Sequence, residues 1–230
     1  MKAVVLLSGG LDSSTLLYQA QAEGMNCYAL SFDYQQRHRQ ELSAAVAIAT
    51  AAQVSHHQIV AFDLSLWGGS ALTDLRIDLP IRSIAEMANH IPITYVPARN
   101  TIFLSFALAY AEAIAAHRVY IGVNRLDYSG YPDCRPDYIH AMQEVFRLGT
   151  KQGRLGHPIE IHTPLIDLHK SEIIDLGDRL GVPWAQTWSC YSDGSGSPPQ
   201  ACGQCDACKL RLAAFTQLSL TDPIPYRNST

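Results

Sequence analysis

Four cysteines late in the chain have the spacing of a metal site: Cys190, Cys202, Cys205 and Cys208. The two C-x2-C steps, with a Gly- and Ser-rich spacer before them, allow four thiolates to surround one Zn²⁺ at Zn–S distances of about 2.3 Å. An iron–sulfur cluster is the alternative, although no cysteine followed by proline completes that pattern. Unliganded thiols are the other alternative. Because four thiolates leave no position for water, we expect a structural zinc ion.

A second pattern opens the chain, where an aliphatic run over 4–7 precedes Ser8, Gly9, Gly10, Leu11, Asp12, Ser13 and Ser14. The apolar run predicts a buried strand, and the glycines predict a sharp turn beside a ligand. We expect Asp12, Ser13 or Ser14 to cap the helix that follows. Free backbone N–H groups and the helix dipole at such a turn bind anions. The alternative is an ordinary connection between a strand and a helix.

This loop is not the lysine-containing phosphate loop of many nucleotide-binding proteins, because no lysine lies between Lys2 and Lys151. The carboxylate of Asp12 would repel bound phosphates unless a cation lay between them. We therefore expect Mg²⁺ beside Asp12, since this ion prefers oxygen ligands.

Other polar residues stand at the ends of predicted strands or the starts of predicted helices. Arg37 and His38 follow a strand, where open α/β sheets bind ligands. Arg99 precedes a helix and could pair bidentately with a phosphate or carboxylate. Lys170 opens another helix, where its charge opposes the dipole, so it should have an anionic partner. For each of these residues, a solvent-exposed side chain is the alternative.

The loop over 124–136 is unusually rich in side chains that recognise ligands. It follows a buried strand and contains Asn124, Asp127, Tyr131, Asp133, Cys134 and Arg135. We interpret it as a substrate-binding loop.

Strands and helices alternate along the chain and predict parallel βαβ units with right-handed crossovers, an α/β fold. The expected strands cover 4–7, 27–32, 57–61, 119–123 and 159–162, and the expected helices 13–23, 37–53, 101–116, 136–150 and a segment ending at Gly181. We expect residues 62–97 to form a long irregular segment. We predict an ATP-binding domain over 1–185 and a zinc-binding element over 186–230 within one compact unit.

Composition narrows the function classes. Hydrophobic residues make up 47% of the chain and charged residues 17%, which is typical of a soluble globular protein. The apolar runs are shorter than the roughly 18 residues of a membrane helix, and the N-terminus does not resemble a signal peptide. A net charge of −4 disfavours direct binding to nucleic acid. Few, clustered cysteines indicate a reducing compartment, so we expect a cytoplasmic enzyme with small-molecule substrates.

The segment 8–13 resembles the pyrophosphatase loop (PP-loop) of ATP-pyrophosphatases. Nearly the whole chain resembles the 7-cyano-7-deazaguanine synthases, the queuosine-biosynthesis family of that superfamily. The segments that carry this resemblance are 8–13, 33–38, 69–74, 96–100, 122–124, 127–136, 163–165 with Lys170, 187–191 and 201–208. The resemblance implies a Rossmann-like parallel sheet, similar to adenine nucleotide alpha hydrolases, with a four-cysteine zinc element, and it implies a homodimer.

The resemblance also implies a ligase that forms C–N bonds. ATP would activate 7-carboxy-7-deazaguanine, ammonia would give an amide, and a second activation of the amide oxygen would allow dehydration to the nitrile. The loop from Ser8 to Ser14 and Arg99 would bind ATP, and Ser8, Asp12, Ser13 and Lys170 would act in catalysis. The expected substrate-binding residues are Arg37, His38, Asn124, Asp127, Tyr131, Asp133 and Arg135.

The chain departs from the family pattern at two places, and three other functions stay open. Ala98 stands where many relatives have glycine, and the spacer between Cys190 and Cys202 is slightly long. One alternative is a tRNA-thiolating enzyme with Cys134 as persulfide carrier, which the acidic charge disfavours. A synthetase with its own glutaminase would need a longer chain, so free ammonia is the expected nitrogen source. The third alternative is a nucleotide-binding module without catalytic activity that zinc holds together.

Overall fold

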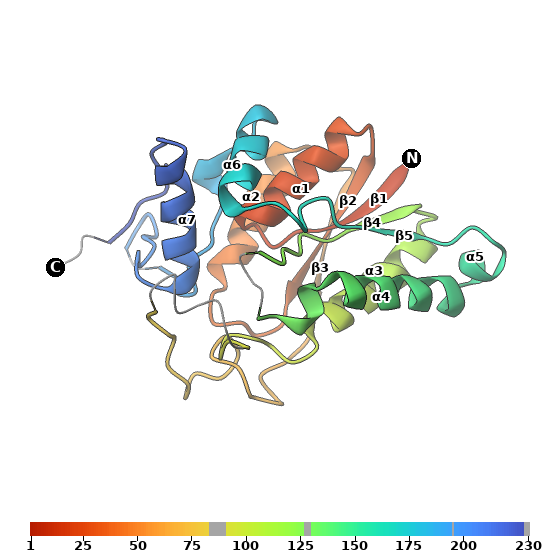
Figure 1. Cartoon of the computed structure of the whole chain (residues 1–230), viewed down its shortest axis with the longest axis horizontal. Coiled ribbons are helices and arrows are strands. Elements are labelled where there is room, and N and C mark those ends of the chain that lie inside the picture. The colour runs from red at the N-terminus through yellow and green to blue at the C-terminus, as the bar shows by residue number, and fades with distance from the viewer. Residues whose placement is uncertain (83–90, 127–129, 195, 228–230) are drawn as a thin grey trace.

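A parallel five-stranded sheet forms the centre of the protein (Figure 1). The computed structural model of the chain describes residues 1–82, 91–126, 130–194 and 196–227. The strands are ordered β3-β2-β1-β4-β5 and comprise β1 (Lys2–Leu6), β2 (Asn26–Asp33), β3 (His56–Ala61), β4 (Arg118–Tyr120) and β5 (Glu160–His162). Strand β1 lies in the middle, with Val4 opposite Tyr28 on one side and Val119 on the other. The predicted parallel α/β fold is confirmed.

Helices cover both faces of the sheet, because successive side chains of a strand point to opposite faces. The helices are α1 (Leu11–Ala22), α2 (Gln40–Ala51), α3 (Arg99–Ala113), α4 (Pro136–Gly149), α5 (Lys151–Arg154), α6 (Lys170–Arg179) and α7 (Asp206–Gln217). Ala3, Val5 and Leu7 pack against α1, α2 and α6, whereas Val4 and Leu6 pack against α3 and α4. Figure 1 shows the two helical layers above and below the sheet.

Several boundaries differ from the expected ones. Strand β4 ends at Tyr120 rather than at residue 123. Helix α1 begins at Leu11 with Gly10 as its N-cap and has no side-chain cap, so the expected cap by Asp12, Ser13 or Ser14 was wrong. The reason is local: the hydroxyl of Ser13 turns back and accepts a hydrogen bond from the backbone N–H of Ser8 at 3.1 Å. Residues 62–82 and 91–98 contain no helix or strand, as expected.

The C-terminal part packs beside helix α6. Helix α7 buries Ala214 and Phe215 against Ile174, Val182 and Trp184. The buried Arg211 of α7 donates to Asp222 Oδ2 at 2.6 Å and to Thr187 Oγ1 at 2.8 Å, which links the helix to both segments. Within the described residues, no helix has both the length and the apolar character needed to cross a membrane. The division at residue 185 stays a prediction.

Candidate active site

The site lies where the strand order reverses, between the carboxyl ends of β1 and β4. From β1 the chain first builds outward through β2 and β3, and then crosses to β4 and β5 on the other side. Open α/β sheets bind ligands in the crevice at such a point. The two ends approach closely here, because a Cβ atom added to Gly122 would lie 3.5 Å from backbone atoms of Asp12 and Ser13. A cavity of about 230 Å³ opens beside them.

The loop after β1 is fixed by its own hydroxyls and by helix α2. The side-chain oxygens of Ser8 and Ser13 lie 3.0 Å apart, and the backbone N–H of Gly10 donates to Ser8 Oγ at 3.3 Å. Gly9 has a φ of +84°, and an added Cβ would lie 2.4 Å from Ala45 N. Only glycine fits this left-handed position pressed against a helix. The loop residues that line the cavity are Ser8, Gly10, Leu11, Asp12 and Ser13.

Two residues of the expected loop set lie elsewhere. Gly9 faces helix α2 rather than the cavity, and Ser14 is fully buried in helix α1. The Ser14 hydroxyl has no hydrogen-bond partner among the described residues. Neither lines the cavity, so their expected contacts with ATP stay predictions.

Lys170 and Asp12 form a buried ion pair at the mouth of the loop. Lys170 Nζ donates to both carboxylate oxygens of Asp12 at 2.8 Å. The side chains are 8% and 18% exposed, and both line the cavity. The anionic partner expected for Lys170 at the start of α6 therefore exists and is a carboxylate of the loop itself. This pair joins α6 to the first turn of α1.

Arg99 enters the cavity from the first turn of α3. It follows Ala98, which has a left-handed φ of +54°. Such a backbone costs a non-glycine residue about 1–2 kcal/mol, so glycine would be the less strained residue at this position. The Arg99 guanidinium lies 5.8 Å from the Phe103 ring. Burial acts against its charge, but the neighbouring Tyr34 and Asp133 raise the pKa of Arg99 above its ordinary value.

Only some residues of the expected substrate-binding loop line the cavity. Tyr131 and Cys134 line the cavity, and the Tyr131 hydroxyl lies 2.7 Å from Thr94 Oγ1. Asp133 does not line it, because its carboxylate accepts the backbone N–H of Asn100 at 3.1 Å and caps helix α3. Arg135 is exposed and lies 3.6 Å from Asp137. The expected residue at position 127 lies outside the described part of the chain.

Neighbouring residues after β2 take different roles. Arg37 donates to the carbonyls of Asp74 and Ile77 at 3.3 and 3.1 Å and does not line the cavity. His38 lines it and is 3% exposed. Asn124 also lines it while its amide N–H donates to the carbonyl of Leu165 at 3.2 Å. The structure thus brings His38 and Asn124 to the cavity, whereas Arg37 binds backbone carbonyls outside it.

Sequence reasoning missed several lining residues: Tyr34, Glu41, Phe103, Ser189 and Tyr191. Two signals were available. Glu41 lies three residues after His38, so the first turn of a helix brings them together. Ser189 and Tyr191 flank Cys190, a predicted metal ligand, in the sequence. In the structure, the neighbouring Trp188 donates its backbone N–H to the carbonyl of Gly9 at 2.9 Å and so brings this segment to the loop.

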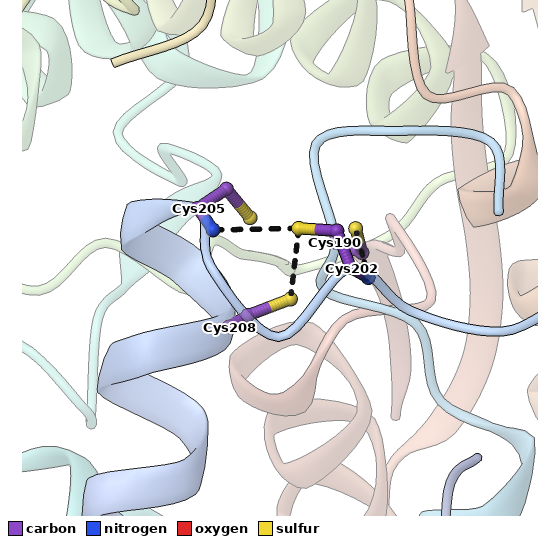
Figure 2. Close-up of side chains that lie close together, drawn as sticks. All are labelled: Cys190, Cys202, Cys205 and Cys208. Carbon is purple, nitrogen blue, oxygen red and sulfur yellow. Dashed lines mark hydrogen bonds between the residues drawn. The ribbon is translucent and has the colours of Figure 1, made fainter. Parts of the chain in front are cut away.

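The four cysteines converge as expected (Figure 2). Their sulfur atoms lie within 4.8 Å of one another, and Cys202 Sγ is 3.9 Å from Cys208 Sγ. Cys190 and Cys202 come from loops, while Cys205 and Cys208 belong to the start of α7. Hydrogen bonds with the Cys190, Cys205 and Cys208 thiols lower the pKa of Cys202. Hydrogen bonds with the Cys190, Cys202 and Cys205 thiols, together with burial, raise the pKa of Cys208, so four thiolates require a cation between them.

Comparison with known proteins gives consistent relatives over almost the full length. A family model described as "QueC: Queuosine biosynthesis protein QueC" matches residues 2–219. The chain is 78% identical over 226 residues to the 7-cyano-7-deazaguanine synthase of Acaryochloris marina, covering 98% of this chain and 99% of that protein. It is 72% identical over 229 residues to the one from Cyanothece sp., covering 99% and 100%. Among solved structures, NMN synthetase from Francisella tularensis shares 17% identity at a TM-score of 0.47, covering 96% and 77%.

Proposed function

The chain belongs to the QueC family of queuosine biosynthesis proteins, and on that premise we propose that it converts 7-carboxy-7-deazaguanine and ammonia to 7-cyano-7-deazaguanine with ATP. The observation that carries the proposal is the cavity at the switch point. The lining combines the loop that we assign to anion binding, with Asp12 and Lys170, and three further polar residues, Asn124, Tyr131 and Arg99. A nucleotide and a purine-like acid can therefore meet there.

The chemistry begins with a leaving-group problem. A carboxylate cannot expel hydroxide, so an oxygen of the substrate carboxylate attacks the α-phosphorus of ATP and pyrophosphate leaves. In our proposal, backbone N–H groups of the loop and the hydroxyls of Ser8 and Ser13, residues that line the cavity, hold that pyrophosphate. Charge preorganised around the departing group lowers the barrier. Among the described residues that line the cavity, Lys170 and Arg99 carry side chains of the lysine and arginine type. In our proposal they supply that positive charge.

The loop also fits a magnesium ion. The carboxylate of Asp12 and the hydroxyls of Ser8 and Ser13 line one end of the cavity, and hard cations take such oxygen ligands. When bound, Mg²⁺ neutralises phosphate charge that Asp12 would otherwise repel. In the ligand-free protein, both carboxylate oxygens of Asp12 accept hydrogen bonds from Lys170.

The cysteine cluster fits one zinc ion. Tetrahedral ligands at about 2.3 Å from zinc lie about 3.8 Å from each other, close to the 3.9 Å between the sulfurs of Cys202 and Cys208. A multinuclear iron–sulfur cluster places its ligands on different irons and needs more space. We therefore propose a structural Zn²⁺ that holds Cys190, and with it the lining residues Ser189 and Tyr191, against the loop.

The alternative role in tRNA thiolation finds no support at Cys134. A persulfide carrier needs an accessible thiolate. Cys134 is 6% exposed, and burial raises its pKa to about 12, with Asp133 adding to the effect. We therefore propose that the substrates are small molecules and that the protein has no direct nucleic-acid partner. We also propose that it is a cytoplasmic protein and forms a homodimer. Light scattering of the purified protein tests the dimer.

The decisive experiment supplies ATP, Mg²⁺, ammonia and 7-carboxy-7-deazaguanine and follows both products by mass spectrometry. A nitrile formed with AMP and pyrophosphate is the expected result. A nitrile formed with ADP keeps the substrate but overturns attack at the α-phosphorus. Absence of any nitrile from the zinc-loaded protein overturns the proposed function.

A further inference from the structure

We propose that His38, oriented by Glu41, is the general base that removes protons from the reacting nitrogen. This inference rests on the proposed function and assigns a catalytic role that substrate binding alone does not require. His38 lies in the connection between β2 and α2, and Glu41 lies in the first turn of α2. Both side chains line the cavity.

The two side chains form a histidine–carboxylate dyad. His38 Nε2 lies 3.1 Å from Glu41 Oε2, and the exposed fractions of the two side chains are 3% and 18%. An ionised carboxylate only accepts hydrogen bonds, so the ring hydrogen of neutral His38 sits on Nε2. The remaining nitrogen, Nδ1, is then an acceptor. A carboxylate that fixes the tautomer of a catalytic histidine in this way also stabilises the imidazolium that forms.

The other ring nitrogen is the unusual feature. His38 Nδ1 is buried and has no hydrogen-bond partner among the residues that the structure describes. Buried polar atoms in proteins are nearly always hydrogen-bonded, so an orphaned acceptor on a residue that lines the cavity indicates a ligand. The ligand must offer a hydrogen to Nδ1, and the N–H groups of ammonia, an amide or an imidate do so.

The dyad lies next to the loop that we assign to ATP. A Cβ atom added to Gly9 would lie 2.6 Å from the carbonyl oxygen of Glu41, so the loop and the first turn of α2 are in contact. The ring of Tyr191 lies 6.0 Å from the His38 ring and belongs to the lining. His38 thus stands beside the place where phosphate transfer and attack by nitrogen have to coincide.

The reaction requires a base more than once. When ammonia attacks the acyl-adenylate, a C–N bond forms, the C–O bond to AMP breaks, and nitrogen loses one proton. The amide oxygen then attacks a second ATP, forming a P–O bond as pyrophosphate leaves. Breaking the second C–O bond releases AMP and forms the nitrile, and nitrogen loses its two remaining protons. Activation of the carboxylate involves no such proton, so the base acts only after it.

This division gives a sharp test with the variant His38→Gln in the full-length, zinc-loaded protein. Rapid-quench mass spectrometry follows the acyl-adenylate, the amide and the nitrile in a single turnover. We expect the adenylate to form within a few-fold of the wild-type rate and both nitrogen steps to slow by about 10²–10⁴-fold. Glu41→Gln should slow the same steps to a smaller extent. His140→Gln, on the exposed side of α4, is the matched control and should leave every step unchanged.

The outcomes separate the base from its alternatives. Nitrile formation by His38→Gln at the wild-type rate overturns the proposal. Equal slowing of adenylate and nitrile formation also overturns it, since it makes His38 a binding or structural residue. Formation of the adenylate shows that the variant is folded. Failure of the proposed function itself is recognised separately, because the wild-type protein would then form no nitrile.

Discussion

Replacing Asp12 by asparagine should destabilise the protein, even in the absence of any ligand, because it removes the carboxylate charge that pairs with Lys170. Both carboxylate oxygens accept from Lys170 Nζ at 2.8 Å, and the lysine side chain is only 8% exposed. Removing one partner of a buried ion pair costs about 3–5 kcal/mol. Because Asp12 is 18% exposed and water reaches it, we expect a smaller cost than this, about 2–3 kcal/mol.

Urea unfolding of the ligand-free protein measures this free energy directly. In a chain of this size 1 kcal/mol corresponds to about 2–4 °C, so the melting temperature should fall by about 4–12 °C. The double variant Asp12→Asn/Lys170→Met should lose less than the sum of the two single variants, by at least about 1 kcal/mol. The single variants should also lose substrate-dependent cleavage of ATP.

The exposed pair of Arg125 and Asp167 provides the matched control. Its side chains are 48% and 64% exposed, and such surface pairs contribute about 0–1 kcal/mol. Asp167→Asn should therefore change the free energy of unfolding by less than about 1 kcal/mol. If Asp12→Asn costs no more than this control, or if the effects of the two single variants simply add, the pair does not stabilise the fold as we argue.

Three further perturbations test other parts of the structure. Gly9→Ala should abolish ATP binding, measured by calorimetry, because the added Cβ would lie 2.4 Å from Ala45 N. Gly24 is the control, since it has a similar φ of +80° but no atom within 4 Å of an added Cβ. Gly24→Ala should lose about 1–2 kcal/mol of stability and still bind ATP. Wild-type protein should contain one zinc ion per chain by atomic emission; Cys208→Ser should lose the ion and melt at lower temperature, and retention of full zinc would contradict the four-cysteine site. Burial, with Glu23, raises the pKa of Cys27 from 9.0 to about 12. Folding thus favours its protonated form, a stabilisation that is fully present below pH 9 and lost between pH 9 and 12, at up to about 1.4 kcal/mol per pH unit. The stability difference between wild type and Cys27→Ala should shrink over that window.

The sequence predicted best those features that follow from strand alternation. Ser8, His38 and Asn124 each follow a different strand, and all three line one cavity. The reason is general, because the carboxyl ends of parallel strands lie at the same edge of a sheet. Likewise, the short spacing of the cysteines predicted their convergence, since C-x2-C steps at the start of a helix already bring the sulfurs close together.

Side-chain direction and long-range capping could not be predicted in this way. Arg37 and His38 are neighbours in sequence, yet one supports the carbonyls of the 74–77 segment and the other lines the cavity. Asp133 sits in a loop rich in recognition residues, but its carboxylate caps α3 at Asn100, 33 residues away. Irregular loops have no periodicity from which a facing direction could be inferred, and a cap supplied by a distant segment leaves no local pattern.

Lys170 lies between these two cases and shows how far electrostatic reasoning from sequence extends. A cation in the first turn of a helix is unfavourable by itself, so its position predicted that an anion lies nearby without identifying it. The fold supplies the identity, because α6 packs on α1 and brings Lys170 to Asp12. In the ligand-free protein, Lys170, which we propose as a phosphate-binding residue, is therefore paired with Asp12, the carboxylate that we assign to Mg²⁺. Binding of ATP with its metal must then redistribute this pair, with the lysine gaining phosphate oxygens as the carboxylate gains the ion. Loss of either residue should consequently weaken binding of MgATP more than binding of AMP, which carries neither the pyrophosphate nor its metal.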